Sequence, residues 1–323
     1  MSFHDWHRRS LVLVSVLVLA SACAGPESQP GQSPAVEQPP PMDLLVTTEW
    51  LSEHLDDPDL VVLDCTVVIE QSEDGSFRAV SGQASYEGGH IPTAGFADLT
   101  GDLCDRDSPH DYALPTPEQF SEIMGALGVG DDSLVVLYDG YGSAWAARVW
   151  WMLRWVGFDR AALLDGGLGA WTAEGRPLST EAPDRPAKKL TPVPRWELIA
   201  DRDEVFAAIE DDAVQLIDAM PEPHYLGQMA MYDRPGHIPS AINIPVTGLT
   251  DESGHFRSFD ELAAMHDLDP DARAITYCGG GIAASSNAFV MTRLGFTNVA
   301  VYIASLQEWA ADPALPMVVD TPD

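Results

Sequence analysis

Cys278 stands where the sequence is best suited to nucleophilic chemistry. It follows a short apolar run, 274–277, that predicts a buried strand, and it precedes three glycines and a helical pattern. Glycines let the backbone curl until successive N–H groups point inward, and a helix start adds the positive end of its dipole. Both effects favour thiolate over thiol, and they would equally stabilise a charged persulfide. The predicted cradle consists of Gly279, Gly280, Gly281, Ile282, Ala283 and Ala284.

The surrounding residues disfavour other chemistries at this cysteine. A Cys-x5-Arg loop would predict a phosphatase, but the sixth residue after Cys278 is Ala284, and the next basic residue is Arg293. No second cysteine or histidine stands at metal-ligand spacing, so we expect no metal and no cofactor. A histidine partner that is close only in space stays open. A merely structural cysteine at a strand end would not account for the strand, cysteine, glycines and helix together.

Strands that alternate with helices must position this loop. Continuous apolar runs indicate strands at 61–63, 134–138, 161–164, 214–217, 274–277 and 299–303. Amphipathic patterns indicate helices that open at 47–51 or cover 117–127, 144–156, 168–173, 202–209, 259–266 and 282–294. The alternation predicts an α/β fold of parallel sheets with helices on both faces. Chemistry in such folds lies at the carboxyl ends of strands, where Cys278 stands.

The chain beyond its first 42 residues contains one unit twice. The motif G-H-I-P at 89–92 recurs at 236–239, an offset too long for a solenoid repeat. We interpret the two histidines, His90 and His237, as turn residues rather than catalytic acids. The region 176–195 holds five prolines and no apolar periodicity, which predicts a connection between domains. The expected divisions are a domain at 43–180, a linker at 181–195 and a second domain at 196–318.

The first 22 residues predict an export signal. Basic residues at 7–9 precede ten mostly apolar residues, 11–20, a run too short to span a membrane. The letters A-S-A-C at 20–23 resemble a bacterial lipoprotein box, in which Cys23 would be lipidated, but they also fit a cleavage site for ordinary secretion. The segment 23–42 predicts a flexible linker. We therefore expect a cell-envelope lipoprotein, periplasmic or on the outer surface, or else a secreted soluble protein.

The charge balance restricts the partners. Against 17 basic residues stand 50 acidic ones, so the net charge is −33. Such a surface repels phosphate backbones and anionic lipids, which argues against nucleic-acid binding and against membrane contact other than through an N-terminal lipid anchor. The plain interpretation is solubility in salt or at an exposed cell surface, and a small cationic partner stays open.

From about residue 44 to residue 316 the chain resembles the two-domain rhodanese-type sulfurtransferases of the thiosulfate and 3-mercaptopyruvate type. The sequence GHIPSAINIP at 236–245 resembles their characteristic turn and strand, and DGGLGAW at 165–171 resembles their D-G-G-x-x-A-W motif. Residues 138–140, Y-D-G, with AARVWWML at 146–153, are similar to their inactive first domain, where an acid replaces the nucleophile. The resemblance implies two rhodanese-like domains, the first non-catalytic and the second catalytic, with the site near their interface.

The resemblance also implies a ping-pong cycle at Cys278. A small donor, 3-mercaptopyruvate or thiosulfate, would charge the cysteine to a persulfide, and cyanide or a thiol would discharge it. The loop resembles the C-G-S-G-x-T-A loop of mercaptopyruvate-type members, except that Ala283 replaces the threonine. Family members also tend to carry two arginines upstream, where this sequence has Met220 and His224. His224 and Arg234 are the candidates for contacting an anionic donor, and for each the alternative is a solvent-facing loop residue.

The missing arginines keep a second function open, a lipoprotein that carries sulfane sulfur on Cys278 for a partner enzyme without turnover. Catalytic release of thiocyanate from a donor and cyanide would distinguish the enzyme from the carrier. Two further cysteines, Cys65 and Cys104, would stand in an oxidising envelope if the chain is exported, and the sequence leaves open whether they pair.

Overall fold

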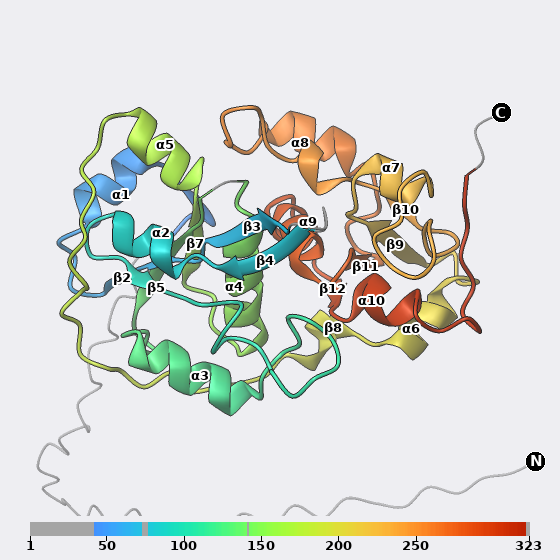
Figure 1. Ribbon diagram of the computed structural model, residues 1–323, viewed down its shortest axis with the longest axis horizontal. Helices are drawn as coiled ribbons and strands as arrows, with labels where there is room; N and C mark the ends of the chain where they lie inside the picture. The colour runs from blue at the N-terminus through green and yellow to red at the C-terminus, as the bar shows by residue number, and fades with distance from the viewer. Residues whose placement is uncertain (1–41, 73–76, 141, 321–323) are drawn as a thin grey trace, which may run out of the picture. The chain divides into compact units, whose positions relative to one another are not determined.

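The computed structural model describes residues 42–72, 77–140 and 142–320, and it contains two parallel sheets of five strands each (Figure 1). In the first sheet the strand order is β1-β7-β6-β2-β5, and all neighbours are parallel. Its strands are β1 (Leu45–Val46), β2 (Leu60–Asp64), β5 (Gly95–Phe96), β6 (Leu134–Tyr138) and β7 (Ala161–Leu164). The helices of this half are α1 (Thr48–His54), α2 (Gln83–Gly88), α3 (Pro117–Ala126), α4 (Ala144–Trp155) and α5 (Gly167–Ala173).

The second sheet repeats this order as β8-β12-β11-β9-β10, again with parallel neighbours. Its strands are β8 (Ile199–Ala200), β9 (Val214–Asp218), β10 (Ile242–Asn243), β11 (Arg273–Tyr277) and β12 (Val299–Tyr302). The helices are α6 (Arg202–Ala208), α7 (Glu222–Tyr225), α8 (Phe259–Met265), α9 (Ile282–Arg293) and α10 (Ser305–Trp309), with short 3-10 turns η1 (Trp196–Leu198) and η2 (Val246–Gly248). The predicted α/β fold of two parallel sheets flanked by helices is confirmed.

The repeated G-H-I-P turns have the same construction in both halves. His90 stacks on Tyr86 with 3.9 Å between ring centroids, and His237 stacks on Tyr225 with 3.8 Å. In each pair Nδ1 of the histidine lies 2.8 Å from the carbonyl oxygen of that tyrosine. Both histidines are buried, so their interpretation as turn residues that hold backbone is confirmed.

Helices α4 and α9, which follow the two central strands β6 and β11, pack against each other. Trp150 of α4 meets Phe289 of α9 edge to face, with ring centroids 4.9 Å apart at an interplanar angle of 88°. One cluster of buried apolar side chains runs through both halves at this contact. The starts of both helices, and the loops before them, are therefore held in a fixed relation.

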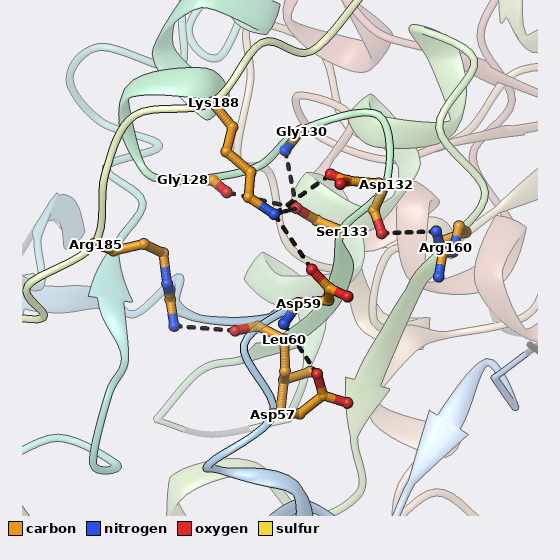
Figure 2. Close-up of polar contacts among 10 residues, drawn as sticks. All are labelled: Asp57, Asp59, Leu60, Gly128, Gly130, Asp132, Ser133, Arg160, Arg185 and Lys188. Atoms are coloured by element: carbon orange, nitrogen blue, oxygen red, sulfur yellow. Dashed lines mark hydrogen bonds and ion pairs between the residues drawn. The ribbon is translucent and has the colours of Figure 1, made fainter.

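The proline-rich segment 176–195 is fixed to the first half although it forms no helix. Nη2 of Arg185 donates to the carbonyl oxygen of Leu60 at 3.0 Å, and Nζ of Lys188 lies 3.3 Å from the carboxylate of Asp132 (Figure 2). The connection between the two halves therefore runs over the surface of the first.

An antiparallel hairpin, β3 (Val67–Gln71) with β4 (Phe77–Ser81), belongs to the first half and has no counterpart among the described residues of the second (Figure 1). Its side chains are unusually apolar for their exposure, because Ile69 is 54% and Phe77 is 73% exposed. Exposed apolar side chains of this size often mark a binding surface.

Cys65 and Cys104 are both free thiols, the first buried and the second half-buried, so the pairing that the sequence left open is not formed. The predicted signal peptide, Cys23 and nearly all of the predicted linker 23–42 lie outside the described residues. In the part of the chain that the structure describes, no helix has the length and apolar character needed to cross a membrane.

Candidate active site at the Cys278 loop

Cys278 lies between the end of β11 and the start of α9, and it is only 3% exposed. The N–H group of Leu306 in α10 donates to its carbonyl oxygen at 3.0 Å. Its own N–H group donates to Oγ of Ser305 at 3.2 Å, and that hydroxyl donates to the carbonyl oxygen of Tyr302 at 2.6 Å. Ser305 has a φ of 52°, a left-handed conformation that serine adopts rarely. Hydrogen bonds from its N–H group and to its carbonyl oxygen therefore hold the backbone of Cys278 on both sides.

The first half contains a similar loop, one residue longer before its helix, with an aspartate at the position of the cysteine. Asp139 follows β6 as Cys278 follows β11, and Leu168 donates to the carbonyl oxygen of Asp139 at 3.0 Å, as Leu306 does to that of Cys278. Three N–H groups around the start of α4 donate to the carboxylate of Asp139: those of Ser143, Trp145 and Ala146, at 3.1, 3.0 and 3.1 Å. In this protein a loop of this kind therefore holds a negative charge.

In the cysteine loop the matching N–H groups are those of Gly281, Ala283 and Ala284. The two loops are aligned on the residues that directly precede their helices, Ser143 and Gly281. Both residues have a left-handed backbone, with φ of 58° and 79°. Within the described chain, no oxygen accepts a hydrogen bond from any N–H group of residues 279–284. Sγ of Cys278 accepts no hydrogen bond from them either within the described chain, so these N–H groups are available to an anion that binds at the loop.

Close neighbours require glycine in this loop. A Cβ atom at Gly279 would collide with the hydroxyl group of Tyr232. A Cβ atom at Gly281 would lie 3.0 Å from Nη1 of Arg148, and the φ of 79° there already disfavours any side chain. The glycines thus serve close packing around the cysteine as well as the turn.

Arg148 of α4 reaches the cysteine loop from the first half, and sequence reasoning missed it. Its side chain is fully buried, Nη1 lies 3.5 Å from the carbonyl oxygen of Gly281, and Nη2 donates to the carbonyl oxygen of Tyr112 at 2.8 Å. Burial lowers the pKa of Arg148 to about 10, and the charge of Cys278 opposes this shift, so the guanidinium stays cationic at neutral pH. The available signal was an arginine within the apolar helical pattern 146–153.

The structure shows which groups surround Arg234 and His224, the two residues expected to contact the donor. The guanidinium of Arg234 donates to four carbonyl oxygens of the C-terminal segment, at 2.7 to 2.9 Å; these belong to Trp309, Ala310, Asp312 and Leu315. These bonds occupy Arg234 with holding the chain end, which corrects its expected role as a ligand of the donor. His224 lies half-buried in α7, and its Nδ1 has no hydrogen-bond partner in the described chain.

A groove of about 820 Å³ opens beside the cysteine loop. Tyr112 and Tyr232 line it and also approach the glycines after Cys278. The side chain of Gln307 ties one wall to the loop, because its Oε1 accepts from the N–H of Asp111 at 2.8 Å and its Nε2 donates to the carbonyl oxygen of Asp111 at 3.0 Å. Cys278 itself does not line the groove, so a reactant there would lie against Tyr112 and Tyr232, the residues that separate the groove from the glycines of the cysteine loop.

Both groove tyrosines are neutral phenols over the physiological range. Burial raises the pKa of Tyr112 to about 12, with a further contribution from the carboxylate of Asp111. Burial also raises the pKa of Tyr232, and the negative charges of Cys278 and Asp111 raise it further. Each tyrosine therefore offers the groove a phenol that can donate a hydrogen bond, beside an aromatic face.

Comparisons with known proteins agree on one family. A family description, Rhodanese-like domain, matches residues 47–174 and 201–312. The 3-mercaptopyruvate sulfurtransferase of Escherichia coli (strain K12) is 33% identical over 281 residues, which cover 84% of this chain and 96% of that protein. A probable 3-mercaptopyruvate sulfurtransferase of Pseudomonas aeruginosa is 35% identical over 283 residues, which cover 84% and 97%. Thiosulfate/3-mercaptopyruvate sulfurtransferase 2 of Arabidopsis thaliana is 32% identical, with 92% of each chain covered.

Solved structures give the same fold. The crystal structure of SseA from Escherichia coli, described as having the rhodanese fold of 3-mercaptopyruvate sulfotransferases, aligns with a TM-score of 0.72 and 32% identity over 80% of this chain and 97% of that one. A complex of EanB with ergothioneine aligns with a TM-score of 0.73 over 87% of this chain and 71% of that one. At 22% identity the second likeness concerns the fold alone.

Proposed function

This chain belongs to the rhodanese family, as a two-domain sulfurtransferase related to the 3-mercaptopyruvate and thiosulfate enzymes, and from that premise we propose that it carries sulfane sulfur as a persulfide on Cys278. The observation that carries the proposal is the pair of matched loops. Where the first half binds a carboxylate through three N–H groups, the second half has a cysteine and N–H donors without an acceptor in the described chain.

In the proposed first step the thiolate of Cys278 attacks the outer sulfur of the donor. With 3-mercaptopyruvate, the carbon–sulfur bond breaks, its electron pair takes up the thiol proton on carbon, and pyruvate leaves. With thiosulfate, the sulfur–sulfur bond breaks and sulfite leaves with the electron pair. Either route gives the anion Cys–S–S⁻, which the N–H groups of Gly281, Ala283 and Ala284 would stabilise together with the helix start.

In the proposed second step an acceptor attacks the outer sulfur of the persulfide. When the acceptor is cyanide, it takes the outer sulfur and leaves as thiocyanate. When the acceptor is a thiol, its sulfur bonds to the outer sulfur, and its proton passes to the new persulfide. The sulfur–sulfur bond at the enzyme breaks, and its electron pair stays on Sγ of Cys278 as thiolate. Sulfur passes between thiols at an unchanged oxidation state, so this exchange requires no oxidant and no metal or cofactor enters it.

The proposed site consists of Cys278, the six cradle residues that follow it and the positioning residue Arg148. We propose 3-mercaptopyruvate rather than thiosulfate as the better donor, because the loop after Cys278 has no basic residue to bind a dianion. Two of the relatives reported above are named for 3-mercaptopyruvate alone, and the third is named for both donors. His224 remains a proposed donor contact on the basis of its sequence position; its Nδ1 is buried without a hydrogen-bond partner in the described chain, and the residue does not line the groove beside the cysteine loop.

Mass spectrometry combined with turnover tests the proposal. The protein is incubated with 3-mercaptopyruvate and then with cyanide, and both its mass and the released thiocyanate are followed. We expect a gain of one sulfur atom on Cys278, reversed by cyanide, and many thiocyanate molecules per protein. A stable gain without turnover would instead support the carrier function. No gain on Cys278 would contradict both.

We also propose, from the N-terminal sequence, that the protein is exported and lipidated at Cys23. Expression with a radioactive or clickable fatty acid tests this, with Cys23→Ala as the control. Label in the wild type and none in the variant is expected. Secretion of an unlabelled protein cleaved after residue 22 would favour the ordinary signal peptide.

A further inference from the structure

The groove beside Cys278 has an aromatic and acidic lining that the sulfur-transfer proposal does not use. Tyr112 and Trp145 meet at an edge-to-face angle of 66° with ring centroids 5.5 Å apart, and both line the groove. Their rings form a corner with two aromatic faces. Such a corner attracts an ammonium group through the negative charge above each ring face.

The carboxylates of the groove add to this attraction. Asp105 and Asp111 line it, and within the described residues the carboxylate of Asp111 forms no hydrogen bond or ion pair, since Gln307 bonds only to its backbone. Asp111 influences both groove tyrosines, because its charge raises the pKa of Tyr112 and of Tyr232. Its negative field therefore extends to the rings that stand next to the cysteine loop.

The cations near the groove do not balance these carboxylates. Arg78 pairs with Glu70 at 3.2 Å, and Arg106 pairs with Asp102 at 3.5 Å, so each guanidinium has a carboxylate of its own. Arg148 is fully buried and donates to the backbone of Tyr112, so its positive charge acts on the groove from behind that residue but offers the groove no free donor. With the ion-pair partners and Arg148 counted, one net negative charge remains beside the aromatic corner, and the uncharged side chain that completes this part of the lining is His110.

We propose that this groove selects thiol acceptors of one chemical class, small thiols that carry an ammonium group. The inference rests on the proposed function, since the acceptor thiol attacks the persulfide of Cys278. The ammonium group lies in the corner of Tyr112 and Trp145 near Asp111, while the thiol sulfur bonds to the outer sulfur. The proton and electron pair move as in the proposed second step.

Single-turnover kinetics with three matched thiols tests the selection. The enzyme is charged with 3-mercaptopyruvate, freed of donor, and mixed with cysteamine, 2-mercaptoethanol or 3-mercaptopropionate, which are cationic, neutral and anionic. The rate constant for loss of persulfide is measured by quenching and mass spectrometry. Each thiol is compared with itself across protein variants, so its own acidity cancels.

Asp111→Asn is the test variant, and Asp107→Asn is its control in the same loop, outside the groove lining. We expect Asp111→Asn to lower the rate constant for persulfide loss to cysteamine about threefold to tenfold. The rate constant with 2-mercaptoethanol should stay within about twofold, and that with 3-mercaptopropionate should increase. Asp107→Asn should change all three by less than about twofold. Added salt should weaken the cysteamine preference of the wild type, because it screens exposed charges.

Equal effects of the two variants, or equal effects on all three thiols, would overturn the inference and leave the proposed function standing. If the persulfide forms and all three thiols discharge it at rates that do not depend on their charge, the inference is likewise overturned and the proposed function stands. A protein that forms no persulfide on Cys278 would overturn both.

Discussion

The loop at Asp139 and the loop at Cys278 begin from the same architecture and differ in what occupies the N–H cradle. The aspartate fills its cradle with its own carboxylate, which accepts three N–H bonds. The cysteine places a neutral or anionic sulfur at the same point and leaves the N–H groups of residues 279–284 without a protein acceptor in the described chain. A cradle closed by a carboxylate is a structural element, whereas one that faces a sulfur can stabilise charge that appears during a reaction.

The inert loop also shows why the first half is part of the site. Helix α4 starts at the aspartate loop, and its next turn places Arg148 against the cysteine loop. The same half supplies Tyr112, Trp145 and Asp111 to the groove. The first half therefore contributes a buried positive charge next to the cysteine loop and most of the lining of the groove.

The largest effect is expected from Cys278→Ser, which makes the second loop as inert as the first. A serine hydroxyl is far too weakly acidic to be charged by a sulfur donor, so thiocyanate production should fall by about a thousandfold or more. The variant should keep its fold, because the change is nearly isosteric. Thiocyanate assay and circular dichroism check both points, and retained turnover would mean that another group carries the sulfur.

Arg148→Met tests whether the first half stabilises the charged sulfur. Loss of a buried cation beside Cys278 should reduce kcat/KM about tenfold to a hundredfold, as expected for about 1.5 to 3 kcal/mol of charge-assisted interaction. Alkylation of Cys278 by iodoacetamide at pH 7 should slow as well, which a purely structural role would not produce.

The control for Arg148 is Arg154→Met on the same helix. Arg154 lies over the ring of Trp150 at 5.1 Å and pairs with Asp159 instead of approaching the cysteine loop. It should affect stability but not the alkylation rate. Equal alkylation rates in the Arg148 variant and the wild type would refute the electrostatic role.

Gly281→Ala tests the left-handed residue that both loops place before their helices. The first half tolerates Ser143 at φ 58°, but at Gly281 a Cβ atom would also lie 3.0 Å from the carbonyl oxygen of Ile303. We expect a loss of about 1 to 2 kcal/mol in unfolding free energy and a severalfold loss of activity. Urea denaturation and the thiocyanate assay measure these. Ser143→Gly should be neutral or stabilising, and a neutral Gly281→Ala would contradict the comparison.

A final prediction involves no change in activity and concerns the stability contributed by the two carboxylates that end β2 and β9. Burial raises the pKa of Asp218 to about 7, opposed by the N–H of Met220 and the hydroxyl of Tyr277, and burial likewise raises the pKa of Asp64. A folded-state pKa above the unfolded value of about 3.9 gives stability that is fully present below that value and is lost as pH rises through about 7.

Asp218→Asn imitates the protonated acid. Its stability relative to the wild type should therefore increase by roughly 2 to 3 kcal/mol between pH 5 and pH 8. Asp64→Asn should change in the same direction. Urea denaturation at the two pH values checks both variants, and a relative stability that is the same at both pH values would show that Asp218 is already ionised in the folded protein at pH 5.

Much of the fold was predictable because its central strands are long, continuous apolar runs. The strand predicted at 134–138 is β6 without change, and the one at 274–277 is β11 less one residue. The edge strands β1, β5, β8 and β10 were missed, since two residues carry no periodicity. The hairpin β3–β4 was missed as well. Its strands are mixed in character and largely exposed, so no alternation of buried and solvated positions marks them.

In the candidate site, too, some residues could be predicted from local sequence patterns and others could not. The cysteine, its glycines and the following helix are adjacent in the sequence, so local patterns were enough to identify them. Arg234 was interpreted through its position in the sequence, and its four carbonyl partners, all 75 or more residues away, give it another role. Contacts between distant segments leave no local signature.

The sequence by itself determined the α/β class and the duplication, and it singled out Cys278 as the proposed nucleophile, because each depends on residues within one strand, turn or helix. Only the tertiary structure decided what surrounds the sulfur. The packing of α4 against α9 brings Arg148 to the cysteine loop, 133 residues away in sequence, and Gln307 ties Asp111 to it across 196 residues. A charge at such a distance in sequence acts on the cysteine only through space, so its effect depends on a position that the packed core alone fixes.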